Sequence, residues 1–395
     1  MPHHSSKSLR PLDPHANTTG RSAGWGKTPW QIDFHPAPRR LPRRVDFAII
    51  GGGFTGLAAA AWLRRIAPRR SVAVFEAGSI GAGSSGRTGG IALGETAAGD
   101  LPGLGDVLAG YAKILRTLKV NCELSLGGAY ELARRAGLAE SPISWADSGN
   151  LRVAKEIPGG SVNPGKVVSG LARAAQRLGA RIFEHVRVED IAHGESVRLL
   201  ARGAEVLARG ALVATNALSL ELSGLAGRAQ PKFTLAVATE PLTARQLAAV
   251  GLASRKPFYT VDLPYLWGRL MASNRVIFGS GLVHLKDWME LETLDIAKGE
   301  LAELLASLIR RARGLHPALR HVNFSHRWGG PMLIGEDWTP VFARHPGSER
   351  VLVLGAYSGH GVALSVFLGC WAAEALLGWR DVPPWSAAPG DRKIG

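Results

Sequence analysis

VDFAIIGGGFTGLAAAAWLRRIAPRRSVAVFEAG, residues 45–78, is the stretch that decides the fold. It opens with an apolar run, Val45 to Ile50, which predicts a short strand buried on both faces. A glycine-rich turn follows, and the alanine-rich segment after it predicts a helix that ends near Ile66. A second apolar run, Val72 to Phe75, predicts another buried strand, which ends at Glu76. Strand, turn, helix and strand in this order predict a βαβ unit of a parallel sheet.

The turn between the first strand and the helix has the spacing of a dinucleotide-binding motif. Gly51 permits the tight turn, Gly53 lets the backbone approach a pyrophosphate, and Gly56 lets the helix lie close to the strand. The helix start supplies unpaired N–H groups and the positive end of the helix dipole. Glu76, twenty positions after the last glycine, is placed to accept hydrogen bonds from ribose hydroxyls. The motif therefore predicts a bound dinucleotide without a 2′-phosphate.

A second glycine-rich loop, GSIGAGSSGRTGGIALG at residues 78–94, follows directly after Glu76. A nicotinamide dehydrogenase has no use for such a loop at this place. An extended FAD needs one, because polar backbone must pass the pyrophosphate and continue under the isoalloxazine ring. The loop therefore favours FAD over a nicotinamide.

At this loop the sequence resembles the FAD-dependent oxidases of the D-amino-acid oxidase superfamily, in the branch of glycine oxidase, sarcosine oxidase and γ-glutamylputrescine oxidase. The pattern Gly-Ala-x-Ser-x-Arg-x-Gly-Gly of that family is matched between Gly81 and Gly90, with Thr88 where Asn is commoner. Further matches follow at residues 162–191, 211–218, 265–283 and 326–344, so that the resemblance extends from about Val45 to Trp379.

The resemblance implies an α/β fold: a Rossmann-like FAD-binding domain of the glutathione-reductase type, with an inserted α+β substrate domain on a mostly antiparallel sheet. We expect an extended N-terminal arm (1–44), a discontinuous FAD-binding domain (45–100, 150–228 and 335–380), a substrate-binding domain (101–149 and 229–334) and a C-terminal tail (381–395). By position in the family motifs, the residues implied to bind FAD are Gly51, Gly53, Phe54, Thr55, Gly56, Glu76, Ala77, Ser84, Ser85, Arg87, Thr88, Gly89, Gly90, Val188, Thr215, Asn216, Gly330, Gly359, His360, Gly361 and Val362.

The longest apolar run, GAYSGHGVALSVFLGCWAAEALLGW at residues 355–379, allows three interpretations when taken alone: a membrane anchor, a buried helix or a wall of the cofactor site. The resemblance favours the last, with a glycine turn under the flavin and a helix start aimed at the ring. The backbone N–H groups there would stabilise the negative charge of the reduced ring. The His360 side chain has two readings, since it either fills space beside the flavin or tunes its charge and its reactivity with oxygen.

The resemblance also bears on the substrate. Amino-acid-specific relatives hold the substrate carboxylate with an arginine shortly after a Trp-x-Gly sequence, which here is Trp328 to Gly330, and the arginine position falls on Met332. A thioether cannot hold a carboxylate, so the substrate is either an amine without an α-carboxylate or an acid held from another direction by Arg269 or Arg327. Trp328 and Trp267, ahead of Tyr259 and Tyr265, are the expected aromatic walls of the substrate site.

The implied reaction is the oxidation of a primary or secondary amine, or of an amino acid, by hydride transfer to flavin N5, with hydrolysis of the imine and transfer of the electrons to O2. Neither Cys122 nor Cys370 matches the position at which relatives attach FAD covalently, so we expect non-covalent FAD. Three alternatives stay open: a dehydrogenase that passes electrons to a quinone or another acceptor, an FAD-dependent RNA-modifying enzyme, and a flavoprotein subunit without chemistry of its own.

The charge and the cysteine content of the chain limit the partners and the compartment that can be expected. The net charge of +15, from 47 Lys and Arg against 32 Asp and Glu, is spread as pairs without a basic stripe, so no nucleic acid is expected. The two cysteines are far apart and favour a reducing compartment, and we expect a cytoplasmic protein with no metal site and no membrane span. The first 44 residues lack the apolar segment of a secretory signal. Trp25, Trp30 and Phe34 are expected to pack on the body or on a second copy, and a homo-oligomer is left open.

Overall fold

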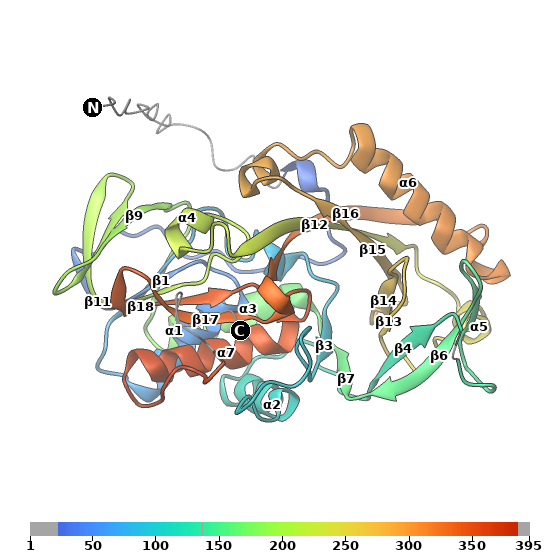
Figure 1. Cartoon of the computed structure of the whole chain (residues 1–395), viewed down its shortest axis with the longest axis horizontal. Helices are drawn as coiled ribbons and strands as arrows, with labels where there is room; N and C mark the ends of the chain where they lie inside the picture. Colours follow the sequence, from blue (N-terminus) through green and yellow to red (C-terminus); the bar gives the residue numbers. More distant parts are fainter. Residues whose placement is uncertain (1–22, 136, 386–395) are drawn as a thin grey trace, which may run out of the picture.

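The structure, a computed structural model, describes residues 23–135 and 137–385. The expectations for the first 22 residues of the arm and for residues 386–395 of the tail lie outside this part of the chain. Two sheets lie beside each other, one covered by helices on the left of Figure 1 and one on the right. Strand β16 (Phe324–Gly335) is the edge strand of the second sheet, and near its end Ile334 forms a bridge with Tyr357, which follows the first sheet (Figure 1).

The first sheet has the order β17-β18-β11-β1-β2-β8. The pairs from β18 to β8 are parallel, and β17 adds an antiparallel edge. Strands β9 and β10 continue antiparallel from β11 as a meander, seen at the far left of Figure 1. The bounds are β1 (Arg44–Ile50), β2 (Val72–Phe75), β8 (Arg181–Phe183), β9 (Val188–Ala192), β10 (Val197–Ala201), β11 (Ala204–Val213), β17 (Val341–His345) and β18 (Ser348–Gly355).

Four helices pack beside this sheet: α1 (Phe54–Ile66), α2 (Val107–Thr117), α3 (Pro164–Arg177) and α7 (Gly361–Leu376). In α1 a row of alanines allows close contact with α3 and α7. The apolar run of the sequence forms α7, which is buried on nearly all sides between the sheet, α1 and α2. In the part of the chain that the structure describes, the helices are all too short or too polar to cross a bilayer. Burial therefore accounts for the length of this apolar run.

The second sheet has the order β16-β12-β15-β14-β13-β4-β6-β5 and is antiparallel except between β13 and β4. Helix α6 (Gly299–Gly314) lies along its outer face at the top of Figure 1, and α5 (Ala244–Ala249) lies near its far edge. The strands are β4 (Ala129–Ala133), β5 (Ser144–Ala146), β6 (Asn150–Ile157), β12 (Ala229–Thr239), β13 (Phe258–Thr260), β14 (Trp267–Leu270), β15 (Val276–His284) and β16 (Phe324–Gly335).

A small antiparallel pair, β3 (Ile91–Leu93) and β7 (Gly159–Ser161), joins the two parts, and α4 (Leu220–Ser223) follows β11. The predicted fold class is confirmed: a Rossmann-like parallel sheet with helices, and a mostly antiparallel second sheet inserted into it. The exact residues at which the two domains divide stay a prediction.

Candidate functional site

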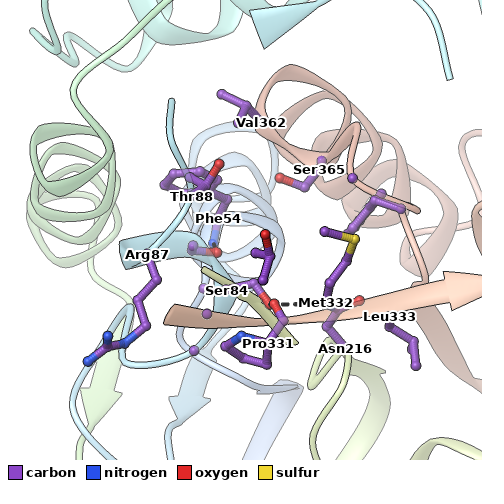
Figure 2. A pocket seen from close by; sticks show the side chains of 18 of the residues that line it. Phe54, Ser84, Arg87, Thr88, Asn216, Pro331, Met332, Leu333, Val362 and Ser365 are labelled. Carbon is purple, nitrogen blue, oxygen red and sulfur yellow. Dashed lines mark hydrogen bonds between the residues drawn. The ribbon is translucent and has the colours of Figure 1, made fainter. Parts of the chain in front are cut away.

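A cavity of about 660 Å³ opens where the carboxyl ends of the parallel strands meet the second sheet. Its walls come from the turn before α1, the end of β2, the loop 83–89, the end of β11, the middle of β16 and the turn before α7. Ligands of open α/β sheets bind at this end of the strands. Figure 2 shows side chains from several of these segments around the cavity, among them Phe54, Thr88, Asn216 and Met332.

The turn before α1 has the geometry expected of the motif. Gly51 has a φ of 109°, in the region that favours glycine, and a Cβ there would overlap the Ala214 carbonyl. Gly53 caps the helix without a side-chain hydrogen bond, and the first turn of α1 carries no acidic residue. The helix start therefore offers its positive end to the cavity. Gly56 does not line the cavity, and a Cβ there would overlap the Gly51 carbonyl, so its task is close packing of helix and turn.

Glu76 is bound to the turn itself. Its carboxylate accepts hydrogen bonds from the backbone N–H groups of Gly52 (2.7 Å) and Gly78 (2.8 Å). The pKa of Glu76 is raised, mainly by burial and to a smaller extent by the neighbouring Glu184. The two hydrogen bonds act in the opposite direction. Glu76 lines the cavity beside Ala77. It therefore fixes the glycine turn and presents an acceptor to the cavity at the same time.

The loop 84–90 is linked to both halves of the molecule. Ser85 Oγ accepts a hydrogen bond from Phe54 N (2.9 Å), and Ser84 Oγ donates to the Pro331 carbonyl (2.8 Å; Figure 2). The Asn216 amide donates to Ser84 Oγ (3.2 Å) and accepts from Ala356 N (2.9 Å), so that it joins this loop to the end of β18.

Three buried hydroxyls test whether a dinucleotide fits. Thr215 Oγ1, Thr234 Oγ1 and Ser365 Oγ are buried and have no hydrogen-bond partner within the described chain, and all three residues line the cavity. A buried hydroxyl without a partner costs free energy, so a bound polar ligand is the expected partner. The open helix start, the acceptor at Glu76 and these hydroxyls together fit a long polar cofactor such as FAD.

The turn before α7 faces the same cavity. Gly359 has a φ of 90°, and the space beside its Cα is open up to Met332 Sδ. His360 caps α7 without a side-chain hydrogen bond to the helix, and Nδ1 lies 3.3 Å from the Ser358 carbonyl. Burial lowers the pKa of His360, against smaller opposite effects of that carbonyl and of Glu95, and thus favours the neutral ring. The first turn of α7 therefore presents backbone N–H groups and no acidic side chain to the cavity.

The opposite end of the cavity has aromatic and apolar walls. Tyr259, Tyr265 and Trp267 line it, whereas Met332 from β16 lines the cavity beside the turn before α7, next to Gly359. The Trp267 ring lies against the Cα atoms of Gly89 and Gly279, where any Cβ would overlap it. The Tyr259 hydroxyl lies 3.4 Å from a carboxylate oxygen of Glu95 and 3.4 Å from one of Glu131, and burial followed by these two charges raises the pKa of Tyr259.

Two expected substrate residues lie behind the wall. Trp328 does not line the cavity, is 1% exposed, and donates its indole N–H to the Arg87 carbonyl (2.9 Å). Arg269 also stays outside the cavity, and its Nε donates to the Gly89 carbonyl. Arg327 lies in β16 next to Trp328 and points to the exposed side. The structure thus brings Met332, Trp267 and His360 together at the cavity and places Trp328 and the two arginines outside it.

The remaining cofactor predictions mostly lie at the cavity. Gly90 does not line it; it has a φ of 78° and a Cβ there would overlap the Val162 carbonyl. The other predicted FAD residues line the wall: Gly51, Gly53, Phe54, Thr55, Glu76, Ala77, Ser84, Ser85, Arg87, Thr88, Gly89, Val188, Thr215, Asn216, Gly330, Gly359, His360, Gly361 and Val362. Sequence reasoning missed Thr234 and Ser365. The position of Ser365, one helical turn after Gly361, was a usable signal, whereas nothing in the sequence marks Thr234.

The fold and the cavity define a dinucleotide-binding protein whose second domain completes the site. The family model described as FAD dependent oxidoreductase matches residues 46–375, and the chain belongs to this family. It is therefore an FAD-dependent oxidoreductase of the family that acts on amines or amino acids.

Similar proteins match this chain over most of its length. The chain is 28% identical over 377 residues to gamma-glutamylputrescine oxidoreductase of Escherichia coli (strain K12), covering 84% of each chain. It is 26% identical over 381 residues to glycine oxidase of Bacillus licheniformis, covering 88% of this chain and 97% of the relative. The crystal structure of glycine oxidase from Geobacillus kaustophilus superposes with a TM-score of 0.69 at 20% identity, covering 90% of this chain and 100% of that one.

Proposed function

We propose that the protein oxidises a small primary or secondary amine that carries no α-carboxylate, and that the product imine hydrolyses in water. The observation that carries this proposal is the lining of the cavity: by resemblance Met332 occupies the position of the carboxylate-binding arginine, and it lines the same cavity as Tyr259, Tyr265 and Trp267. A carboxylate bound there would lose its hydration without gaining a cationic partner.

The arginines on the cavity wall, Arg87 and Arg187 among the described residues, are placed for other tasks. The Arg87 guanidinium donates to the backbone carbonyls of Trp25, Gly26 and Gly329. Arg187 lies beside Val188, at the end predicted to hold the adenine, and within 3.9 Å of Glu292. Neither supports a site for a substrate carboxylate.

Electrostatics at the substrate end also favour an amine. The carboxylates of Glu95 and Glu131 flank the Tyr259 hydroxyl, and the neutral His360 adds no positive charge. Both carboxylates lie outside the cavity lining, and Glu131 is also paired with Lys155 (3.2 Å), so Glu95 supplies most of the negative charge that would attract an ammonium ion to the aromatic walls. The amine must lose its proton before oxidation.

Bound FAD supplies the chemistry, by accepting a hydride equivalent from the carbon next to the amine nitrogen. The chain holds the cofactor by the start of α1, Glu76 and the loop 84–90. The N–H groups of Gly359 to Val362, at the positive end of the α7 dipole, are placed to stabilise negative charge. Cys122 and Cys370 are buried and do not line the cavity, which supports non-covalent FAD.

We infer O2 as the electron acceptor, with H2O2 as its product. The experiment is anaerobic mixing of the FAD-loaded protein with polyamines, N-methyl amines and amino acids, followed by the absorbance of the oxidised flavin. Amines without an α-carboxylate should bleach this band fastest. Bleaching by α-amino acids alone would overturn the substrate class, and air-stable reduced protein would overturn the acceptor.

A further inference from the structure

The N-terminal segment 24–34, here called the strap, crosses the molecule on its way to β1. At its start the Gly24 carbonyl accepts a hydrogen bond from Ile296 N (2.8 Å), and Lys27 N donates to the Arg327 carbonyl of β16 (3.1 Å). At its end Asp33 N donates to Ser169 Oγ on α3 (2.9 Å). The strap therefore ties the second sheet to the helices of the first.

Glycines on the FAD-binding side leave room for the strap. A Cβ on Gly165 would overlap the Gln31 carbonyl, and a Cβ on Gly81 or Gly86 would lie 2.8 Å from Ile32 Cδ1. Trp25, Trp30 and Phe34 are all buried by these contacts. The expectation that these aromatic residues pack on the body is met within the single chain. Contacts at this spacing indicate a fixed segment of the fold.

Between its two ends the strap holds the flavin loop 84–90. Trp30 Nε1 donates to the Gly86 carbonyl (2.7 Å), and the indole is buried. In the other direction Arg87 donates to the carbonyls of Trp25 (3.0 Å) and Gly26 (3.3 Å), and its guanidinium lies 5.3 Å from the centre of the Trp25 ring. Figure 2 shows the Arg87 side chain pointing away from the other labelled cavity residues.

Three backbone carbonyls of this loop each accept a hydrogen bond from a side chain outside the loop. Gly86 O accepts from Trp30, Arg87 O from Trp328 and Gly89 O from Arg269, all through buried side chains. The N–H groups of Arg87 and Thr88 both donate to the Ser84 carbonyl (3.1 and 3.0 Å), so this segment is a closed turn that the three side-chain donors hold from outside. The turn and its neighbours Ser84, Ser85, Arg87, Thr88 and Gly89 line the cavity, so a shift of the Gly86 peptide would move that wall.

We propose that Trp30 is a positioning residue for the flavin: its indole N–H fixes the Gly86 peptide, and the strap thereby sets the affinity and the environment of FAD. The proposal rests on the flavin-binding role proposed above for the loop 84–90. The strap thus makes a segment ahead of the dinucleotide motif part of the cofactor site.

The test compares Trp30→Phe with Trp145→Phe. Both substitutions keep a buried ring and remove one indole donor, but Trp145 Nε1 donates to the Val250 carbonyl at the end of α5 (3.0 Å), and neither residue lines the cavity. Loss of one buried hydrogen bond near 1.4 kcal/mol corresponds to about tenfold in affinity. We expect Trp30→Phe to raise the Kd of FAD about tenfold and to shift the flavin absorption bands. Trp145→Phe should change the Kd less than about twofold.

Thermal unfolding of both apoproteins separates positioning from general destabilisation. Equal Tm losses with a Kd change confined to Trp30→Phe support the proposal. An unchanged Kd and unchanged flavin bands in Trp30→Phe overturn it. If Trp30→Phe does not fold, Gly165→Ala displaces the strap at Gln31 while Trp30 is kept, and the same rise in Kd is expected. An unchanged Kd in this variant overturns the proposal too.

The same titration of the parent protein separates a failure of the proposed function from a failure of the role proposed for the strap. Parent protein that binds no FAD, or whose flavin no amine reduces, contradicts the proposed function. Parent protein that binds and reduces FAD normally, with a Trp30→Phe variant that does the same at equal Kd, contradicts only the role of the strap.

Discussion

One part of the cavity wall is formed mainly by backbone groups, and another part is formed mainly by large side chains. The end proposed to hold the cofactor consists of backbone turns, short hydroxyl side chains and Glu76, held by hydrogen bonds such as Gly52 N to Glu76 (2.7 Å) and Phe54 N to Ser85 (2.9 Å). The wall proposed to meet the substrate consists of large side chains from strands of the second sheet, Tyr259 and Trp267, with Met332 beside the turn at Gly359.

This difference has a physical consequence. A site made of backbone tolerates few residue types, because a Cβ at a turn glycine overlaps a neighbouring carbonyl, as at Gly51 and Gly56. A site made of side chains on a rigid sheet can change its ligand by single substitutions that leave the backbone in place. The cofactor end is therefore expected to lose function on small changes, and the substrate end to exchange one function for another.

The largest effect is expected at the glycine turn. Gly56→Ala places a Cβ against the Gly51 carbonyl, and α1 must move away from β1 to accept it. We expect purified Gly56→Ala protein to retain less than about one hundredth of the parent's FAD affinity. The measurement is the ratio of FAD to protein after gel filtration. Gly314→Ala, where a Cβ meets nothing within 4 Å, is the matched control and should bind FAD like the parent. Full FAD loading of Gly56→Ala would show that the turn tolerates a displaced helix.

Glu76→Gln should have the next largest effect. Each carboxylate oxygen accepts a backbone N–H, and the amide of Gln would turn an NH2 group toward one of these donors. A lost hydrogen bond to a charged group is worth about 1.5–3 kcal/mol, so the Kd of FAD should rise about tenfold to a hundredfold in an equilibrium titration of apoprotein.

Glu221→Gln serves as the control for this variant, because Glu221 accepts from Trp288 Nε1 (2.8 Å) and does not line the cavity. A Kd that rises equally in both variants would mean that Glu76 acts only through stability.

The same difference explains how far the sequence predicted the site. Gly51, Gly53 and Glu76 could be placed from spacing alone, because the βαβ unit leaves one local geometry for that turn. The loop 84–90 and the turn at Gly359 were placed at the cavity by resemblance, because the residues they contact lie far away in the chain. The mostly parallel first sheet and the mostly antiparallel second sheet were also predicted correctly.

Side chains on the second sheet were harder to place. Neighbours along a strand point to opposite faces, and the sequence around Trp328 does not say which face meets the flavin loop. Trp328 proved to hold the Arg87 carbonyl, and Arg269 the Gly89 carbonyl, both behind the cavity wall. Thr234 came to the cavity only through the pairing of β12 with β16, which no local pattern reveals.

Met332→Arg tests whether the substrate end exchanges one function for another. The guanidinium would extend from β16 toward the turn at Gly359, where Met332 Sδ now lies. A charge-assisted hydrogen bond to a carboxylate should raise the ratio of kcat/KM for α-amino acids to that for simple amines by about tenfold or more. The measurement is steady-state turnover with paired substrates.

Met332→Leu is the control, since it keeps an apolar side chain of similar volume and should leave this ratio within about twofold. If Met332→Arg protein binds FAD but shows no change in this ratio, position 332 does not meet the part of the substrate that carries the carboxylate.

The smallest effect is expected at His360. Its pKa is lowered in the folded protein, mainly by burial, so the unfolded chain takes up the proton first as the pH falls through the ordinary value of 6.5. The stabilising effect of the neutral ring is therefore present above pH 6.5 and is lost below it. His360→Asn removes the titrating ring. The Tm of the parent should therefore fall more steeply than the Tm of the variant between about pH 7 and about pH 5, the range around the ordinary pKa of histidine. Turnover at pH 8 should change only about two- to fivefold, because the backbone N–H groups of the turn remain in the variant. Parallel Tm profiles across this pH range would mean that His360 is protonated as easily in the folded protein as in the unfolded chain.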